Sequence, residues 1–313
     1  MTTSEHAPGP VPSQPTSSRP PAVGVVGLGV MGAPMAGHIL RAGFPLHVTA
    51  RRPASAAGLV DAGATWHPNP RALAGHCDVV VLVVPDLPDV EAVLDGPDGL
   101  LAGATGPLVV VISSTVSPDG VRRLDERVRA ASGGLVRLVD APVSGGQEGA
   151  VAGTLAVMVG GAEADVAVAQ PVLAAIGLAV HLGPLGAGQV AKACNQMIVA
   201  ATVLALGEAA VVAERAGLDV AAMLDLLASG YAGSRVLDVK KRRFALHDHS
   251  PSGAARFMVK DLGFASDEAR RTGTVTPQLD VLRAVFTDLT VRGLGDQDTA
   301  VVQAYVEDLG AGR

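Results

Sequence analysis

The residues best suited to chemistry are Lys192 and the polar side chains near it in the segment 186–196, GAGQVAKACNQ. Lys192 and Gln196 are four residues apart, so on a helix they share a face, and Asn195 borders that face. A lysine beside two carboxamides can bind a small polar ligand and exchange a proton with it if burial lowers the pKa of its amine. Gly188, one turn earlier, is expected to leave open space. Taken alone, the segment also fits a surface lysine that lies along its helix.

A second candidate site is a glycine-rich turn made of Gly27, Leu28, Gly29, Val30, Met31 and Gly32. Its predicted neighbours are a strand at 22–26, a helix at 33–42 and a strand at 46–49. In this order of elements, a GxGxxG motif is typical of dinucleotide binding. Gly27 allows the tight turn, Gly29 admits a pyrophosphate, and Gly32 lets the helix pack closely on the strand. Residues 27–31 are therefore predicted to bind a cofactor, and a turn without a ligand is the alternative.

The second strand is followed by Arg51 and Arg52, and no acidic residue occurs before Asp61. An NAD site usually carries an acidic residue here for the ribose 2′-hydroxyl, whereas arginine accommodates the 2′-phosphate of NADP. Arg51 and Arg52 are therefore predicted to favour NADP, although NAD stays possible. The alternative is a pair of solvated arginines.

The first half continues as apolar runs that alternate with helical patterns. Strands are predicted at 78–84, 108–112, 135–139, 155–159 and 179–182, with helices at 88–94, 118–131 and 162–176. This alternation predicts a parallel sheet covered on both faces. Ligands bind beyond the carboxyl ends of such strands, which selects the loops 84–86, 113–115 and 140–146. Val84, Pro85 and Thr115 are accordingly predicted at the cofactor.

The loop at 140–146 ends in Ser144, Gly145 and Gly146. A serine hydroxyl and two backbone N–H groups without side chains beside them can hold a carboxylate. We predict that these three residues bind the substrate, although a Ser-Gly-Gly sequence alone is more often a turn.

The second half shows helical patterns only. They lie at 220–228, 235–245, 257–271, 279–289 and 298–307, after one long helix that continues to about residue 217. Asp261 is expected at the positive end of its helix. The segment 197–213 is apolar on nearly every face, which predicts burial by a domain on one side and a second subunit on the other. A homodimer or homotetramer is therefore expected.

These patterns predict an α/β Rossmann-like N-terminal domain followed by an all-α C-terminal domain. The division is a disordered tail at 1–21, an NADP-binding domain at 22–184, and a helical domain at 185–313 that begins with the long interdomain helix.

Composition excludes several other functions. The net charge of −6 argues against nucleic-acid binding. Cys77 and Cys194 are too few for a disulfide framework or a zinc site, and each is expected to be a small buried hydrophobe. The run His247-Asp248-His249 is expected in a solvated loop, so no metal site is predicted.

The longest apolar run, 197–207, is too short to span a membrane. No signal peptide is evident, and a soluble, cytoplasmic protein is expected.

Four motifs together resemble the β-hydroxyacid dehydrogenase family, which includes 3-hydroxyisobutyrate dehydrogenases and tartronate semialdehyde reductases. They are the cofactor signature VVGLGVMGAPMAGHIL, the substrate loop DAPVSGGQEGAVAGTLAVMVGG, the catalytic helix GAGQVAKACNQ and the later motif FMVKDLGFA. The resemblance covers about residues 22–307. It implies a Rossmann domain followed by a helical domain like that of 6-phosphogluconate dehydrogenase.

The resemblance also implies roles for single residues. Lys192 would be catalytic, Asn195 and Gln196 would bind the substrate with the Ser144 loop, and Lys260 would lie near the cofactor. Two departures bear on the substrate. His38 stands where the family signature usually has Asn, and Gln196 replaces the second residue of the commoner Asn-Asn pair.

The expected function is a reversible, NADP-linked hydride transfer that oxidises a small carboxylate-bearing hydroxy acid to its aldehyde or keto acid. Lys192 would act as the acid/base. Two alternatives stay open: imine reduction, and a catalytically silent NADP-binding module that acts through protein partners. The related imine reductases usually lack this lysine, so Lys192 argues against the first alternative.

Overall fold

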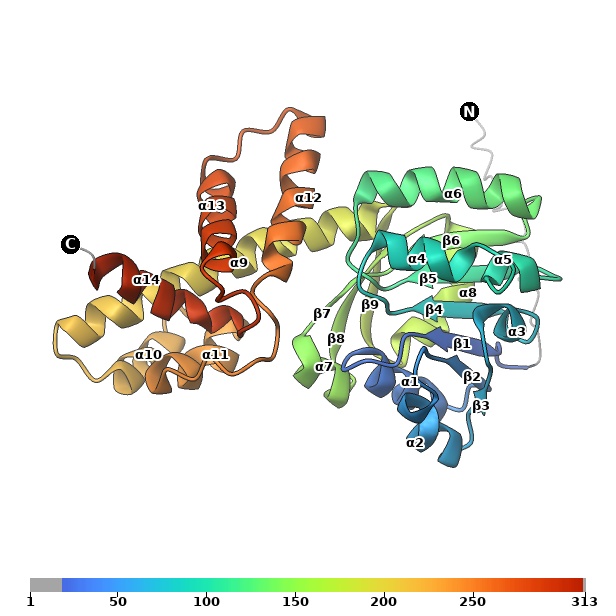
Figure 1. The fold of residues 1–313 in the computed structure, drawn as a ribbon, viewed down its shortest axis with the longest axis horizontal. Helices are drawn as coiled ribbons and strands as arrows, with labels where there is room; N and C mark the ends of the chain where they lie inside the picture. The colour runs from blue at the N-terminus through green and yellow to red at the C-terminus, as the bar shows by residue number, and fades with distance from the viewer. Residues whose placement is uncertain (1–18, 312–313) are drawn as a thin grey trace, which may run out of the picture.

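The structure is a computed structural model that describes residues 19–311. Residues 1–18, most of the predicted tail, lie outside the described residues. Figure 1 shows two halves, a sheet with helices and a group of helices, joined by the long helix α9 (Ala187–Arg215). The predicted fold class is therefore confirmed.

The first half is built on a nine-stranded sheet in the order β3-β2-β1-β4-β5-β6-β8-β7, with β9 paired to β8. Strand β1 lies between β2 and β4, so the chain reverses direction across the sheet beside the glycine turn. The strands are β1 (Val23–Val26), β2 (Leu46–Thr49), β3 (Thr65–Trp66), β4 (Val79–Leu82), β5 (Leu108–Ile112), β6 (Val136–Asp140), β7 (Val143–Ser144), β8 (Leu155–Gly160) and β9 (Gly177–Gly183).

Helices cover both faces of the sheet because the strand side chains alternate between two cores. In β4, Val79 and Val81 join the core under α1 and α8, whereas Val80 and Leu82 join the core under α4 and α6. The helices of this half are α1 (Gly32–Arg41), the 3₁₀ turn η1 (Pro53–Ala56), α2 (Ala57–Asp61), α3 (Pro70–Ala74), α4 (Leu87–Leu94), α5 (Leu100–Gly103), α6 (Pro118–Ser132), α7 (Gly146–Ala152) and α8 (Glu163–Ala174).

The sheet is not parallel throughout, which corrects the prediction. Strand β8 runs antiparallel to both β6 and β7. The reversal arises because β7 and α7 lie in the loop that follows β6, so the chain turns back before β8. Neither short element was predicted, and η1, α2, β3, α3 and α5 were also missed.

The second half contains α10 (Val220–Ala228), α11 (Arg235–Leu246), α12 (Phe257–Thr272), α13 (Pro277–Val291), the 3₁₀ turn η2 (Thr299–Val301) and α14 (Val302–Ala311). Their apolar side chains form one core with α9, in which Phe244 and Phe286 are fully buried. No strand lies in this half among the described residues, as predicted, although one isolated bridge joins Ala254 and Asp298.

Helix α9 is not buried on every face within one chain. Ile198 and Val212 are each 68% exposed. Within residues 19–311, α9 is also the one helix long and apolar enough to cross a membrane, which corrects the argument from the shorter run 197–207. Half of its most apolar stretch is buried inside the chain, and the core helix of a soluble protein passes the same test of length and composition.

Candidate active site

The glycine turn has the geometry that a dinucleotide phosphate requires. Gly27 has a φ of +97°, and a side chain there would meet the backbone of Val83, so only glycine fits. A Cβ at Gly32 would collide with the carbonyl of Gly27, so helix α1 packs directly on the turn. A Cβ at Gly29 would meet nothing within 4 Å. The space beside Gly29 is therefore open to a ligand, at a helix end without an acidic residue in its first turn.

Around this turn, Leu28 is buried and Val30 is exposed. Met31 occupies the N-cap position of α1, and its side chain makes no capping hydrogen bond. Arg51 and Arg52 are both exposed where β2 ends. They lie beside the turn because β2 pairs with β1.

The loops after β4 and β5 are held together by side chains. Ser114 accepts a hydrogen bond from the backbone N–H of Val84 at 3.0 Å. From α9, Gln189 accepts from Val116 N–H at 3.0 Å and donates to the Ser114 carbonyl at 2.8 Å. The loop residues Val84 and Thr115 are thus fixed against the start of α9. Gln189 was not recognised in the sequence, where a glutamine between apolar residues resembles an ordinary helix surface.

A buried carboxylate attaches α9 to the sheet. Asp140, at the end of β6, accepts hydrogen bonds from the backbone N–H groups of Gly186 and Gln189, both at 2.7 Å. Burial raises the pKa of Asp140, and these two bonds oppose that rise. Gly188 lies against this carboxylate, since a Cβ there would come within 2.9 Å of Asp140. The prediction of open space at Gly188 was therefore wrong: the glycine permits close packing.

Lys192 lies two turns into α9 and is only 8% exposed. Burial lowers the pKa of its amine from 10.5 to about 8; Asp261 opposes this shift and Lys260 adds to it. An amine that titrates near pH 8 can both accept and donate a proton under ordinary conditions. Lys192 therefore does not lie along the surface.

A chain of hydrogen bonds runs beside Lys192 and joins the two halves. Ser144 Oγ donates to Asn195 Oδ1 at 3.2 Å. Asn195 Nδ2 donates to Gln196 Oε1 at 2.9 Å, and Gln196 Nε2 donates to Asp261 Oδ2 at 2.6 Å. We call this series of four side chains the amide relay. The predicted substrate residues Ser144, Asn195 and Gln196 are thus in direct contact, and Gly145 and Gly146 are exposed next to Ser144.

The relay ends at Asp261, a residue that the sequence reasoning placed differently. Helix α12 begins at Phe257, so Asp261 lies in its second turn and not at its positive end. Its side chain is buried, and Oδ1 has no hydrogen-bond partner among the described residues. Burial raises the pKa of Asp261, while Lys260 and Lys192 oppose the rise. The adjacent pair Lys260-Asp261 marked this position in the sequence. The sequence did not show that Asp261 also acts on Lys192.

Lys260 fastens α12 to the nucleotide-binding half. Its Nζ donates to the Thr115 carbonyl at 2.5 Å and to the Pro85 carbonyl at 3.5 Å. It also forms ion pairs at 3.7 Å with Asp86 and Asp261. Lys260 thus contacts two of the loops predicted to bind the cofactor.

His38, a departure from the family signature, lies outside this cluster. Its Nε2 is 2.9 Å from the carbonyl of Val151, so it connects α1 to α7, the helix that follows the Ser144 loop. Through this contact, His38 can help to hold α7, and with it the Ser144 loop, in place against α1.

The expectation that both cysteines are buried was wrong for Cys194. Cys194 is exposed, because the helix face opposite Lys192 is uncovered; Cys77 is partly buried, and burial raises the pKa of its thiol to about 12. His247 and Asp248 are exposed, so the prediction of a solvated loop is confirmed. Glu214 and Glu307, from distant helices, place carboxylate oxygens 3.4 Å from the two ring nitrogens of His247. These three residues could hold a metal ion by the spacing of their ligand atoms, which sequence spacing could not show.

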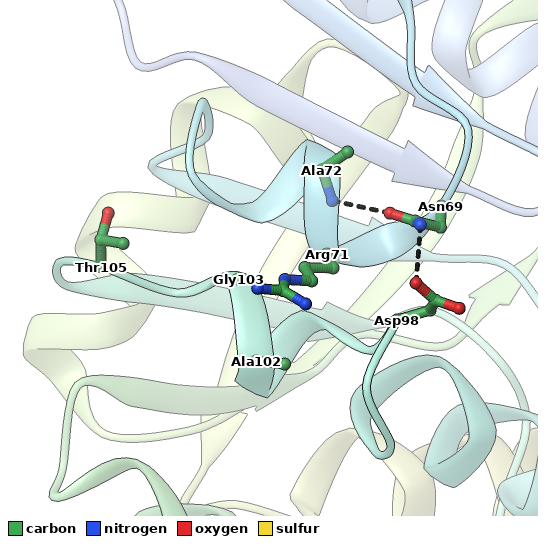
Figure 2. Close-up of a pocket in the computed structure, with 7 residues that line it drawn as sticks. All are labelled: Asn69, Arg71, Ala72, Asp98, Ala102, Gly103 and Thr105. Carbon is green, nitrogen blue, oxygen red and sulfur yellow. Dashed lines mark hydrogen bonds between the residues drawn. The ribbon is translucent and has the colours of Figure 1, made fainter.

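Lys192 lines neither of two surface pockets. Figure 2 shows the first, where Asn69 accepts from Ala72 N–H and donates to Asp98, both at 2.8 Å, beside Arg71. These polar groups already satisfy one another. The second lies behind the start of α9 and is lined by Arg122, Leu182, Pro184, Leu185, Ala187, Val190, Ala191, Glu268 and Arg271.

Comparison with known proteins defines the class. The NAD-binding domain of 6-phosphogluconate dehydrogenase matches residues 22–183. The family described as NAD-binding of NADP-dependent 3-hydroxyisobutyrate dehydrogenase matches residues 186–305. The glycine turn lies in the first match and Lys192 in the second, so the chain is a nicotinamide-dependent dehydrogenase built in two parts.

Individual relatives narrow the class. The chain is 35% identical to the 2-hydroxy-3-oxopropionate reductase of Escherichia coli, over 90% of this chain and 96% of the relative. It is 34% identical to the NAD-dependent L-serine dehydrogenase of Pseudomonas aeruginosa, with the same coverage. The crystal structure of 3-hydroxyisobutyrate dehydrogenase from Salmonella typhimurium has a TM-score of 0.82 and 30% identity, covering 91% of this chain and 99% of that one. The chain belongs to the 3-hydroxyisobutyrate dehydrogenase family of β-hydroxyacid dehydrogenases, and it is an NAD(P)-dependent oxidoreductase.

Proposed function

We propose that the protein uses NADP to interconvert a small 3-hydroxy acid and its semialdehyde, with Lys192 as the acid/base. The observation that carries the proposal is the burial of Lys192 beside the amide relay, at the junction of the two halves. The relatives differ in the acids that their names state, so the particular acid is open to experiment.

The residues present fit a dinucleotide. The open space at Gly29 and the turn at Gly27 suit the pyrophosphate, and exposed Arg51 and Arg52 suit a 2′-phosphate. Val84, Pro85, Thr115 and Lys260 would line the nicotinamide end. When bound, the nicotinamide supplies or accepts the hydride.

Lys192 handles the proton. In oxidation, its neutral amine accepts the proton of the substrate hydroxyl; in reduction, its ammonium donates a proton to the carbonyl oxygen. Asp261 stabilises the ammonium form, and burial favours the neutral form. The balance keeps both forms accessible, which a reversible reaction requires.

The carboxylate of the substrate is assigned to Ser144 and the exposed Gly145-Gly146 backbone. The Ser144 hydroxyl donates to Asn195 in this structure, so it can turn from that acceptor to a carboxylate. Gln196 contributes indirectly, since both ends of its amide are taken up by Asn195 and Asp261.

A paired assay tests the proposal. Small 3-hydroxy acids, including 3-hydroxyisobutyrate, serine and glycerate, are compared with the matching neutral alcohols and with cyclic imines, each with NADP and with NAD. Turnover of at least one acid is expected, with a loss of about 10⁴-fold for its neutral analogue, because donors built for a carboxylate would be left unpaired. Ser144→Ala should raise KM more than it lowers kcat. Equal turnover of alcohols or imines would contradict the proposal and favour imine reduction; no turnover with any compound would favour the silent binding module.

We also propose three properties expected from the sequence: a domain boundary at 184/185, a cytoplasmic location, and assembly into a homodimer or homotetramer. The exposed apolar side chains of α9 support the assembly, and the end of β9 at Gly183 supports the boundary.

A further inference from the structure

Three histidines that the proposed reaction does not use lie together in the nucleotide-binding half. His47 is on β2, His67 follows β3 directly, and His76 comes shortly after α3. Their ring centroids form a nearly regular triangle, with distances of 5.1 Å for His47–His67, 5.1 Å for His67–His76 and 5.6 Å for His47–His76. Three imidazoles from three separate segments thus share one place.

These rings have few other polar partners. His47 Nδ1 lies 2.9 Å from His67 Nε2. Within residues 19–311, this is the one side-chain hydrogen bond of His67, although that residue is only 8% exposed, and His76 has none. A hydrogen bond between two imidazoles needs one N–H and one lone pair, so at least one of the two rings must be neutral.

Burial and the neighbouring rings disfavour protonation of His47 and His67. Burial lowers the pKa of His47, and the neighbouring His67 and His76 lower it further. Burial also lowers the pKa of His67, with His76 adding to the effect. Neutral imidazole is the form that binds transition metals.

We propose that His47, His67 and His76 form a binding site for a divalent transition metal ion of the zinc type. Around a tetrahedral zinc ion, Zn–N bonds of about 2.0–2.1 Å place three imidazole centroids about 5 Å apart, the spacing observed. Nitrogens bound to one such ion lie about 3.3 Å apart, so the His47 and His67 nitrogens need only a small separation. An all-imidazole site favours zinc, nickel or copper over magnesium and calcium, which prefer oxygen.

His76 must turn to complete the site. Its ring lies at an interplanar angle of 16° to that of His47. The three histidines are not among the described residues whose ligand atoms already lie within 4.8 Å of one another, so a His76 nitrogen must be brought toward the other two rings. His76 is exposed and has no hydrogen bond to break, and its rotation is therefore inexpensive. The bound ion would connect β2, the chain after β3 and the chain after α3, and water would take the fourth position.

Calorimetry with the full, tag-free and metal-stripped chain tests the site. Titration with Zn²⁺ near neutral pH should show one tight site, and Mg²⁺ should give no comparable heat. His76→Ala changes an exposed side chain and should still fold. It should weaken Zn²⁺ binding by at least the 10- to 100-fold that loss of a second-shell partner causes. His47→Asn should give a similar loss.

The matched control is His247→Ala, which removes the histidine of the Glu214–His247–Glu307 group. It should leave the tight site unchanged, and Zn²⁺ should raise the melting temperature of this variant but not of His76→Ala. Loss of zinc binding in His247→Ala with retention in His76→Ala would overturn the proposal, as would no binding by the unmodified chain. None of these readouts uses hydride transfer, so they stand apart from the proposed reaction.

Discussion

At the scale of the residue, the acid/base role proposed for Lys192 predicts opposite pH dependences for the rates of oxidation and reduction. Its pKa of about 8 follows from burial. The rate of hydroxy-acid oxidation should rise with pH until about pH 8 and then level, because the neutral amine accepts the proton. The rate of reduction should fall above that pH, because the ammonium donates it. Lys192→Ala should lower kcat by about 10²–10⁴. Steady-state pH profiles in both directions measure these effects.

The matched control is Lys241→Ala, an exposed lysine paired with Asp225, which should leave kcat unchanged. Near-normal turnover by Lys192→Ala would refute the assignment. The variant Lys192→Met tests whether a loss of activity comes from the missing amine and not from unfolding. The folded pKa lies below the unfolded 10.5, so burial of the charge costs about 3 kcal/mol of stability below pH 8. This penalty disappears as pH rises above the unfolded pKa. The methionine variant should therefore unfold at an equal or higher temperature near neutral pH.

Asp261 sets where Lys192 titrates, which gives a second prediction. Its charge raises the pKa of Lys192 against the effect of burial. Asp261→Asn should move the midpoint of the oxidation profile to lower pH and lower the reduction rate at neutral pH. The asparagine can still accept a hydrogen bond from Gln196. The profiles measured for Lys192 are the assay.

Asp267→Asn is the control for this variant, because Asp267 lies on the same helix and pairs with Arg270 at the surface. Its midpoint should match that of the unmodified protein. An unchanged or raised midpoint in Asp261→Asn would show that Asp261 does not stabilise the ammonium of Lys192.

At the scale of the element, the end of β2 provides the cofactor prediction. Arg51 and Arg52 are exposed there, beside the glycine turn that follows β1. NADP should bind more tightly than NAD, because a charge-assisted hydrogen bond contributes about 1.5–3 kcal/mol of binding free energy. This difference corresponds to about 10- to 150-fold in the dissociation constant. Arg51→Ala combined with Arg52→Ala should remove most of that difference. Dissociation constants for both cofactors measure it.

Arg41→Ala is the control for the double variant. It removes an exposed arginine from the C-terminal end of α1, whereas the glycine turn lies at the N-terminal end of that helix. Both affinities should then stay as they were. Equal binding of NAD and NADP by the unmodified protein would show that the arginines do not select the 2′-phosphate.

Local patterns predicted most elements because they depend on neighbouring residues. The glycines at 27, 29 and 32 predicted the turn, and the apolar runs predicted the long strands. The short elements β3, β7 and α7 were missed because two to seven residues carry too little periodicity. The antiparallel turn into β8 depends on pairing between Val143 and Val157, a contact between separate segments that no local pattern contains.

At the scale of the whole molecule, the candidate site exists only because two halves meet. The relay joins Ser144 on the sheet to Asp261 on α12, and Lys260 reaches the carbonyl of Thr115 across 145 positions of sequence. The sequence indicated which residues belong to the site through their motifs. It could not show that Gln196 bonds to Asp261, because that contact depends on how α12 packs against α9.

An exposed apolar stripe on α9 leads to the last prediction, which concerns assembly; Figure 1 shows the course of this helix. Ile198, Ala205 and Val212 are spaced seven residues apart and are exposed, so they form an apolar stripe along one side of the helix. Burial of such a stripe against a second copy would be favourable, since each fully buried Val or Ile contributes about 1.5–3 kcal/mol. We expect a homodimer or larger at micromolar concentration, measured by light scattering. Ile198→Glu combined with Val212→Glu should shift it to monomer, whereas Val60→Glu, on an exposed position of α2, should not. A monomeric unmodified protein would refute this prediction, and an unchanged assembly in the double variant would place the interface elsewhere.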